Sequence, residues 1–297
     1  MDIISVRDFS KEQVEEILSS AEKMEKKIGE TQSSGKVVAT LFFEPSTRTK
    51  LSFQTAASRL GMRYIDFFGE WSSLKKGESF TDTIKNIDGY VDIIVMRHPK
   101  EGSAKLASMI AEAPVVNGGD GGNQHPTQAL LDLYTIKKLK GKIKGLNFNL
   151  VGDLKHARTM QSLMYMLAMF GAKVKLTSPR GLEMDPELVR EVKEKFNAEI
   201  EENDKMDVEG VDILYACRIQ KERFADPYEA MSVQKKFAIG MENLKGAKDD
   251  LAIMHPLPKV GEVDLEIDHT PYAKYFEQSK NGVPTRMAVL DYVLKHR

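Results

Sequence analysis

The sequence contains one cysteine, Cys217, among its 297 residues, and no run of roughly 18 consecutive apolar residues. A single cysteine excludes an internal disulfide framework and is typical of proteins from a reducing cytoplasm. Without a long apolar run no transmembrane helix is expected. The acidic, amphipathic N-terminus also lacks the basic-then-apolar layout of a signal peptide. These absences predict a cytoplasmic protein with no membrane partner.

An excess of charge of one sign is also missing. The chain has 43 Lys and Arg against 44 Asp and Glu, a formal net charge of -1, and the two signs are mixed along its length. A broad nucleic-acid-binding surface is therefore not expected, and any strongly positive site must be a local cluster. The 41% hydrophobic and 29% charged content is that of a soluble globular protein, and the length suffices for two domains.

Several well-known site patterns do not occur. There is no G-x-x-x-x-G-K-[ST] phosphate loop and no G-x-S-x-G nucleophile turn, and "NGGDGGNQ" lacks the third glycine of G-x-G-x-x-G. The six histidines show no i, i+4 pair, and there is no cysteine cluster. We therefore expect no metal and no cofactor.

Short β-rich apolar runs alternate with helical patterns along the chain. Expected strands cover 37–43, 91–96, 114–118, 146–152, 172–178, 211–216 and 251–255. Expected helices cover 11–28, 49–60, 103–111, 126–139, 159–170, 185–196 and 228–236. Near-continuous apolar strands separated by helices are typical of parallel sheets covered on both faces.

A basic, glycine-containing stretch at 137–147 separates two such series. We expect two doubly wound α/β domains, residues 1–138 and 139–282, with the active site in the cleft between them and a hinge near 137–147. Met287, Leu290 and Leu294 have helical spacing, so a C-terminal helix at 283–297 is expected to complete the first domain.

Arginines follow four of the expected strands, and in open α/β sheets ligands bind at the carboxyl ends of strands. These residues are Arg48, Arg97, Arg158 and Arg218. Any one alone is best explained as a surface residue. Four at equivalent places in a chain of near-zero net charge indicate a small polyanionic ligand, because guanidinium groups match carboxylate and phosphate oxygens.

The first of these arginines lies in "FFEPSTRTKLSF" (42–53), where polar residues begin a helical pattern. Ser46 is a candidate N-cap residue, and Gly61 ends the pattern. Free backbone N–H groups at a helix start, together with hydroxyls and a guanidinium, form a phosphate site. The stretch therefore predicts a pocket for the phosphate of a small molecule.

Three further segments carry candidate chemistry. His125 and Gln128 share a helix face after a glycine-rich turn, although His125 is equally well explained as a capping residue. The run "WSSLKKGES" (71–79) has the composition of a solvated loop. "MHPLPKVGE" (254–262) predicts a rigid turn that presents backbone carbonyls.

Five motifs in order, "FFEPSTRT", "HPTQALLDLYTI", "GDLKHART", "RIQKERF" and "HPLPKVGE", resemble the aspartate carbamoyltransferases. The resemblance extends to "NGVPTRMAVL" and so covers essentially the full chain. It implies transfer of the carbamoyl group of carbamoyl phosphate to the amine of L-aspartate, a step of pyrimidine biosynthesis.

The resemblance also implies roles for individual residues. In the family the S-T-R-T element holds the phosphate. Residues of the first domain and backbone carbonyls of the "HPLP" turn hold the carbamoyl and anhydride atoms. The implied carbamoyl phosphate residues are Ser46, Thr47, Arg48, Thr49, Ser72, Lys76, Arg97, His125, Gln128, Leu257 and Pro258. The two carboxylates of aspartate are implied to bind Lys76, Arg158, Arg218 and Gln220.

Within this set, Arg48, Lys76, Arg97 and His125 are the implied catalytic residues. The family's loop, here "SSLKKGES", enters the active site of the adjacent subunit, so a homotrimer with shared sites is implied. Spacing favours Ser72 over Ser73 as the loop contact, and separate regulatory chains remain open as partners.

Departures from the family pattern are Ala157 for a common glycine, Cys217 for a threonine and Lys259 for an arginine. Ornithine carbamoyltransferase is the nearest alternative, but its H-C-L-P turn and S-M-G loop are missing here. Arg218 and Gln220 suit an extra carboxylate. A non-catalytic anion-binding subunit is the alternative from another class.

Overall fold

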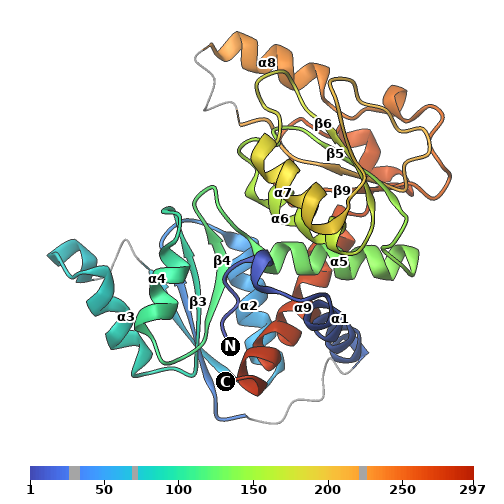
Figure 1. Ribbon diagram of the computed structural model, residues 1–297. Coiled ribbons are helices and arrows are strands. Elements are labelled where there is room, and N and C mark those ends of the chain that lie inside the picture. Colours follow the sequence, from blue (N-terminus) through green and yellow to red (C-terminus); the bar gives the residue numbers. More distant parts are fainter. Residues whose placement is uncertain (27–33, 69–72, 221–225) are drawn as a thin grey trace. The chain divides into compact units, whose positions relative to one another are not determined.

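The computed structural model of the chain describes residues 1–26, 34–68, 73–220 and 226–297 (Figure 1). Two compact units are present: unit 1 comprises Met1–Tyr134 and Asn281–Arg297, and unit 2 comprises Thr135–Lys280. Each unit is built on one sheet in which every strand pair is parallel. The predicted fold class of two doubly wound α/β domains is confirmed.

Unit 1 contains a sheet with the strand order β2-β1-β3-β4. Its strands are β1 (Val37–Phe42), β2 (Arg63–Phe68), β3 (Ile93–His98) and β4 (Val115–Asp120). The helices of this part of the chain are η1 (Val6–Asp8), α1 (Lys11–Lys26), α2 (Thr47–Arg59), η3 (Ser73–Lys76), α3 (Phe80–Asp88), α4 (Ser103–Ile110), α5 (Pro126–Lys140) and α9 (Tyr275–Lys295).

The helices of unit 1 cover both faces of its sheet. Figure 1 shows α3 and α4 on one side and α1, α2 and α9 on the other. This follows from right-handed crossovers, since the chain moves in one direction from β1 to β2 and in the opposite direction from β2 to β3 and β4. Buried Leu41, Ile94 and Met96 belong to the core on the α3 and α4 side.

Unit 2 contains a five-stranded sheet with the order β7-β6-β5-β8-β9. Its strands are β5 (Asn147–Val151), β6 (Lys173–Thr177), β7 (Ile200–Asn203), β8 (Ile213–Ala216) and β9 (Ala252–Met254). Its helices are α6 (Arg158–Met169), α7 (Pro186–Phe196), α8 (Pro227–Lys236), η5 (Met241–Leu244) and η6 (Leu265–His269).

Two strands and one α-helix of the described ranges, β2, β7 and α3, were missed by the sequence prediction. Strand β2 (RYIDFF) is rich in apolar residues but does not alternate, and it exposes Tyr64 and Ile65 at 44% and 47%, whereas β7 buries only Ile200. Helix α3 is short, although Phe80, Ile84 and Ile87 have helical spacing and its start is signalled by Ser79, whose hydroxyl accepts a hydrogen bond from the Asp82 N–H.

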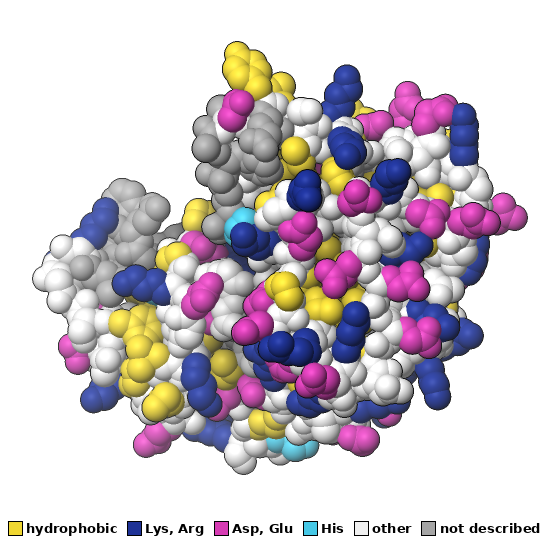
Figure 2. Space-filling model, turned by 45° about the horizontal axis from the view of Figure 1, so that its top comes forward, with side chains coloured by type: hydrophobic (Ala, Val, Ile, Leu, Met, Phe, Trp, Pro, Cys, Tyr) yellow, Lys and Arg dark blue, Asp and Glu magenta, His cyan; other side chains and the backbone are white. Residues whose placement is uncertain are grey.

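The described surface is mixed in charge, and acidic and basic side chains are interspersed over the face shown in Figure 2. Among the described helices, none combines the length and the apolar character that crossing a membrane requires.

Candidate active site

In unit 1 the strand order reverses between β1 and β3. These strands are neighbours, with Phe42 opposite Arg97, yet the chain leaves β1 toward β2 and leaves β3 toward β4. Such a switch point opens a crevice at the carboxyl ends of the strands, where ligands bind in α/β proteins. The predicted S-T-R-T element follows β1, and Arg97 is the fifth residue of β3, so both lie at this end of the sheet.

Helix α2 begins at Thr47, directly after the switch point. Ser46 is the N-cap residue, as predicted, but its side chain makes no capping hydrogen bond. Thr49 is buried. Arg48 is exposed to solvent on one side, and the part of it that is covered by protein lowers the pKa of its guanidinium. A helix start with free backbone N–H groups and an arginine in its first turn is suited to binding an anion.

Arg97 is held in place by its own unit. One terminal nitrogen, Nη2, lies 2.8 Å from Glu44 Oε1, and the other, Nη1, donates to the carbonyl oxygen of Gly118 at 3.2 Å. A Cβ at position 118 would lie 3.1 Å from the Met96 carbonyl oxygen and 3.5 Å from Thr49 Cγ2. Glycine therefore allows β4 to approach the end of β3 and the first turn of α2.

The glycine-rich turn before His125 is organised by Asp120, which sequence reasoning missed. This carboxylate is 1% exposed and accepts hydrogen bonds from the backbone N–H of Gly102 and Gln124 and from the side chains of Asn117 and Asn123. The signal was present in "NGGDGGNQ", where an acid is surrounded by amide side chains. Four donors satisfy the buried charge and fix the turn.

Helix α5 starts immediately after this turn; His125 directly precedes the helix and Gln128 lies in its first turn. His125 and Gln128 are 4% and 8% exposed, and the Gln128 side-chain amide donates to Asp132 Oδ1 at 2.9 Å. The structure therefore brings His125 and Gln128 to the start of one helix in unit 1. It places Lys76 in η3 with an exposed side chain, and Ser72 lies outside the described residues.

Unit 2 has an equivalent switch point between β5 and β8. Val151 at the end of β5 lies opposite Ala216 at the end of β8. Arg158 is the first residue of α6, which follows β5, and it is partly exposed. Arg218 and Gln220 follow β8, with Arg218 exposed and Gln220 partly buried. The two predicted arginines of unit 2 are thus found at neighbouring strand ends.

Packing at these strand ends explains Cys217. A Cβ at Gly152, where φ is +130°, would lie 2.3 Å from the Cys217 carbonyl oxygen, so only glycine fits. The cysteine is 5% exposed, and burial, followed by the charge of Asp153, raises the pKa of its thiol well above the usual value. Cys217 is therefore a packing residue and not an activated thiolate.

The turn that leads into α6 is tied by a buried acid. Asp153 has a fully buried side chain, and its Oδ1 lies 3.0 Å from Nδ1 of His156 and accepts from the His156 backbone N–H at 3.1 Å. These contacts close the turn two residues before Arg158. The position of Arg158 is consequently set by short-range hydrogen bonds within "GDLKHART".

The "HPLP" turn after β9 is fixed by His255 and Glu262, which are 2% and 3% exposed. Nδ1 of His255 accepts from the Leu257 N–H at 2.8 Å, so the ring proton is on Nε2, which lies 2.7 Å from Glu262 Oε1. Leu257 has φ of +56°, and the Leu257–Pro258 peptide bond is cis. The hydrogen bond to His255 holds Leu257 in this left-handed conformation.

Burial alone would raise the pKa of Glu262, but the contact with the His255 ring nitrogen and the hydrogen bond from the Val260 N–H outweigh it and lower that pKa below its ordinary value. Glu262 therefore anchors the turn as a carboxylate. Sequence reasoning missed it because its partner is seven residues away in the chain.

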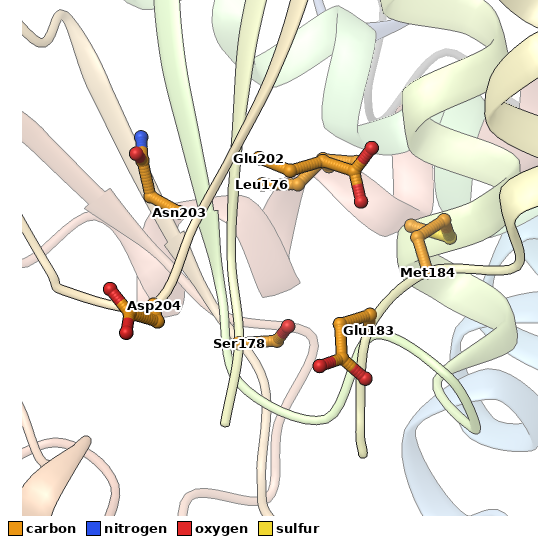
Figure 3. Close-up of a pocket in the computed structure, with 7 residues that line it drawn as sticks. All are labelled: Leu176, Ser178, Glu183, Met184, Glu202, Asn203 and Asp204. Atoms are coloured by element: carbon orange, nitrogen blue, oxygen red, sulfur yellow. The ribbon is translucent and has the colours of Figure 1, made fainter. Parts of the chain in front are cut away.

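One pocket in unit 2 is not part of this arrangement. It has a volume of about 320 Å³ beside β6 and β7, and its lining includes the carboxylates of Glu183, Glu202 and Asp204 (Figure 3). Its negative charge does not suit a polyanion. No group of three or more His, Cys, Asp or Glu side chains in the described ranges is arranged to hold a metal ion.

Fold and sites together define a class: an α/β protein with arginine-bearing strand ends in both of its sheets, suited to small polyanions. Residues 1–138 match the carbamoyl-phosphate-binding domain of aspartate/ornithine carbamoyltransferases, and residues 144–293 match the aspartate/ornithine-binding domain. The chain belongs to the aspartate/ornithine carbamoyltransferase family.

Relatives with curated names agree with this membership. The chain is 49% identical over 300 residues to the aspartate carbamoyltransferase catalytic subunit of Methanopyrus kandleri, covering 99% of this chain and 97% of the relative. It is 50% identical over 302 residues to the corresponding subunit of Thermococcus onnurineus, with 99% and 96% coverage.

Solved structures of the same class superimpose closely. The catalytic subunit of M. jannaschii aspartate transcarbamoylase matches with a TM-score of 0.93 and 45% identity, covering 100% of this chain and 98% of that one. The aspartate transcarbamoylase of Trypanosoma cruzi in complex with carbamoyl phosphate matches with a TM-score of 0.93 and 35% identity, with 97% and 94% coverage.

Proposed function

We propose that the protein is an aspartate carbamoyltransferase, which transfers the carbamoyl group of carbamoyl phosphate to the amine of L-aspartate. The observation that carries this proposal is the presence of arginines at both topological switch points, Arg48 and Arg97 in unit 1 and Arg158 and Arg218 in unit 2. Carbamoyl phosphate and aspartate are both anionic, and each needs such a set.

Unit 1 is assigned to carbamoyl phosphate. The start of α2, from Ser46 to Thr49, binds the phosphate through backbone N–H groups, hydroxyls and Arg48. Arg97, His125 and Gln128 contact the carbamoyl oxygen, the anhydride oxygen and the amide end. Their low exposure supports this role, because water does not compete for buried polar groups.

Unit 2 is assigned to aspartate. Arg158, Arg218 and Gln220 bind its two carboxylates, and a second carboxylate distinguishes aspartate from ornithine, which carries a second amine instead. The backbone carbonyls of Leu257 and Pro258 contact the carbamoyl amine or the attacking amine, which suits a turn held by His255.

In the reaction the neutral amine of aspartate attacks the carbamoyl carbon, so a C–N bond forms while the bond to the anhydride oxygen breaks. The leaving phosphate takes the electron pair of that bond and collects the amine proton, and no covalent enzyme intermediate is needed. Orienting two mutually repelling anions contributes about 7–11 kcal/mol when the reactants are well aligned. Arg97, His125 and Thr49 stabilise the developing oxyanion.

The direct test is to incubate the purified chain with carbamoyl phosphate and either aspartate or ornithine, and to identify products by mass spectrometry. N-carbamoyl-L-aspartate and phosphate are expected with aspartate alone. Citrulline, or no product with either acceptor, would contradict the proposal.

We further propose that the active unit is a homotrimer in which Lys76 and the serine of the same loop act in the site of a neighbouring chain. The edge strand β2 supports this, because it ends directly before this loop and exposes Tyr64 and Ile65, while Leu51 on α2 is 55% exposed. An exposed apolar edge of this kind is suited to subunit contact.

Mixing two inactive variants tests the sharing. Lys76→Ala and Arg48→Ala chains, combined and allowed to exchange subunits, should regain part of the activity because some sites then receive intact residues from both chains. Mass spectrometry of intact trimers verifies the exchange. No recovery after verified exchange would exclude a shared site.

We also propose where the enzyme is located and which further partners it has. A cytoplasmic enzyme is proposed because its one cysteine is a buried free thiol and its substrates are multiply charged molecules that do not cross membranes unaided. Separate regulatory chains are proposed as additional partners. Cell fractionation and affinity purification of the intact complex test these two statements.

A further inference from the structure

Arg286 on α9 is a buried cation that belongs to none of the site residues assigned so far. It is 3% exposed, its guanidinium carbon lies 5.1 Å from the centre of the Phe53 ring of α2, and its Nε has no hydrogen-bond partner among the described residues. Gly282 makes room for it, because a Cβ there would lie 2.4 Å from Arg286 Nη1.

Arg286 lies beside α5, because the same Cβ at Gly282 would also lie 3.6 Å from Leu131 Cδ2, and Asp132 is the next residue of that helix. Burial lowers the pKa of Arg286 to about 10, and the attraction of Asp132 opposes this shift. Asp132 is itself 0% exposed. Each charge is costly to bury alone, so the carboxylate and the guanidinium stabilise each other in their ionised forms. Arg286 thus contacts α2 and acts on α5, the two helices whose first turns form the unit 1 site.

Asp132 controls the orientation of the Gln128 amide. The two residues are four apart on α5, and the Gln128 Nε2 donates to Asp132 Oδ1 at 2.9 Å. An ionised carboxylate can only accept hydrogen bonds, so the amide must turn its NH₂ group toward Asp132 and its carbonyl oxygen away. A neutral side chain at position 132 would allow either orientation.

We propose that Asp132 and Arg286 are positioning residues that keep Gln128 as a hydrogen-bond acceptor and thereby select a carbamoyl group over an acetyl group. The inference rests on the proposed function, in which Gln128 contacts the amide end of carbamoyl phosphate. It assigns a specificity to that contact and a purpose to the two buried charges.

The chemistry of the two acyl phosphates explains the selection. The carbamoyl NH₂ group offers two N–H donors to a fixed carbonyl oxygen, whereas the methyl group of acetyl phosphate has a similar size and offers none. A site with a buried acceptor rejects the analogue that leaves this acceptor unpaired. A freely rotating amide can instead turn away and loses this discrimination.

The test compares carbamoyl phosphate, measured by its KM, with acetyl phosphate, measured by its Ki as a competitive inhibitor. Asp132→Asn keeps the size of the side chain but presents either an oxygen or an NH₂ group to Gln128. Arg286→Gln removes the cation, and Arg286→Lys retains it. Asp291→Asn is the matched control, since Asp291 also pairs with a residue four positions along a helix, Lys295, without contacting Gln128.

In Asp132→Asn and Arg286→Gln the KM for carbamoyl phosphate should rise about tenfold while the Ki of acetyl phosphate changes less than about twofold. Arg286→Lys and Asp291→Asn should keep the wild-type ratio of the two constants. Thermal unfolding of each variant verifies folding, and Arg286→Gln and Arg286→Lys decide the question if Asp132→Asn does not fold.

Equal changes in both constants would reduce the pair to a structural role and overturn the inference, as would an unchanged ratio in Asp132→Asn and Arg286→Gln. Failure of the proposed function looks different, because the wild-type chain would then form no N-carbamoyl-L-aspartate in any of these assays.

Discussion

The switch points of the two units differ in how their polar groups are held. In unit 1, Arg97 pairs with Glu44 at 2.8 Å, and Thr49, His125 and Gln128 are each less than a tenth exposed. In unit 2, Arg218 is exposed and Arg158 is partly exposed. Buried polar groups need partners that hold them in one geometry, whereas solvated arginines do not.

The comparison indicates different functions for the two sets. Groups fixed before the ligand arrives cost no reorganisation during the reaction, so they are suited to the carbamoyl carbon and the developing oxyanion. Solvated arginines mainly attract and bind an anion. Changes in unit 1 should therefore act on turnover, and changes in unit 2 on the affinity for aspartate.

The largest expected effect is that of Arg97→Ala in unit 1. Loss of a fixed guanidinium that stabilises transition-state charge should lower kcat about 10²- to 10³-fold. Steady-state kinetics measure this, with Arg59→Ala at the C-terminal end of α2 as the control. A change confined to KM would place Arg97 in ground-state binding alone.

Arg218→Ala in unit 2 should raise the KM for aspartate roughly 10- to 100-fold, because one charge-assisted pairing with a carboxylate is lost. Binding of carbamoyl phosphate, measured by calorimetry, should not change. Arg190→Ala on α7, an exposed arginine of the same unit, is the control. Equal losses for both substrates would remove the distinction between the units.

Glu262→Gln tests how the "HPLP" turn of unit 2 is held in place. Loss of the buried contact with His255 should reduce the free energy of unfolding by about 1–3 kcal/mol near neutral pH. Because the folded-state pKa of Glu262 lies below 4.5, this stabilisation is complete above pH 4.5 and is lost as pH falls through the folded-state value.

Urea unfolding at neutral pH and again at about pH 4 measures the difference in free energy of unfolding between the wild type and Glu262→Gln. This difference should be smaller at the lower pH. Glu266→Gln, a change of an exposed residue in the neighbouring η6, is the control. A pH-independent difference would show that Glu262 does not act through its charge.

The smallest expected effect is that of Lys259→Met. Lys259 occupies a position where the family commonly has arginine, and its Nζ lies 2.6 Å from Asp268 and 5.4 Å from the centre of the Tyr275 ring. Although both side chains are largely buried, the Tyr275 hydroxyl still donates to Asp268 when Lys259 is lost, so the change should cost about 1 kcal/mol. A larger loss in thermal unfolding would indicate that the turn depends on this lysine.

The sequence was sufficient to predict the alternation of strands and helices and the arginines at strand ends. Apolar runs mark buried parallel strands locally, and the residues just after them mark the ligand edge of the sheet. The edge strands β2 and β7 were missed for different reasons: β7 carries mostly polar side chains, whereas β2 is rich in apolar residues but lacks the alternation of a half-buried strand. Ser46 was correctly predicted as the N-cap residue, but residue type does not specify whether its hydroxyl turns toward the backbone, and here it makes no capping hydrogen bond.

By itself, then, the sequence determined the fold class, the order of the elements and the candidate ligand contacts, since all three depend on patterns a few residues long. Only the tertiary structure decided which buried groups hold those contacts. Asp132 and Arg286 are 154 positions apart in the chain, and burial makes them partners because neither charge is stable alone away from water. Such pairings arise from packing and leave no local pattern.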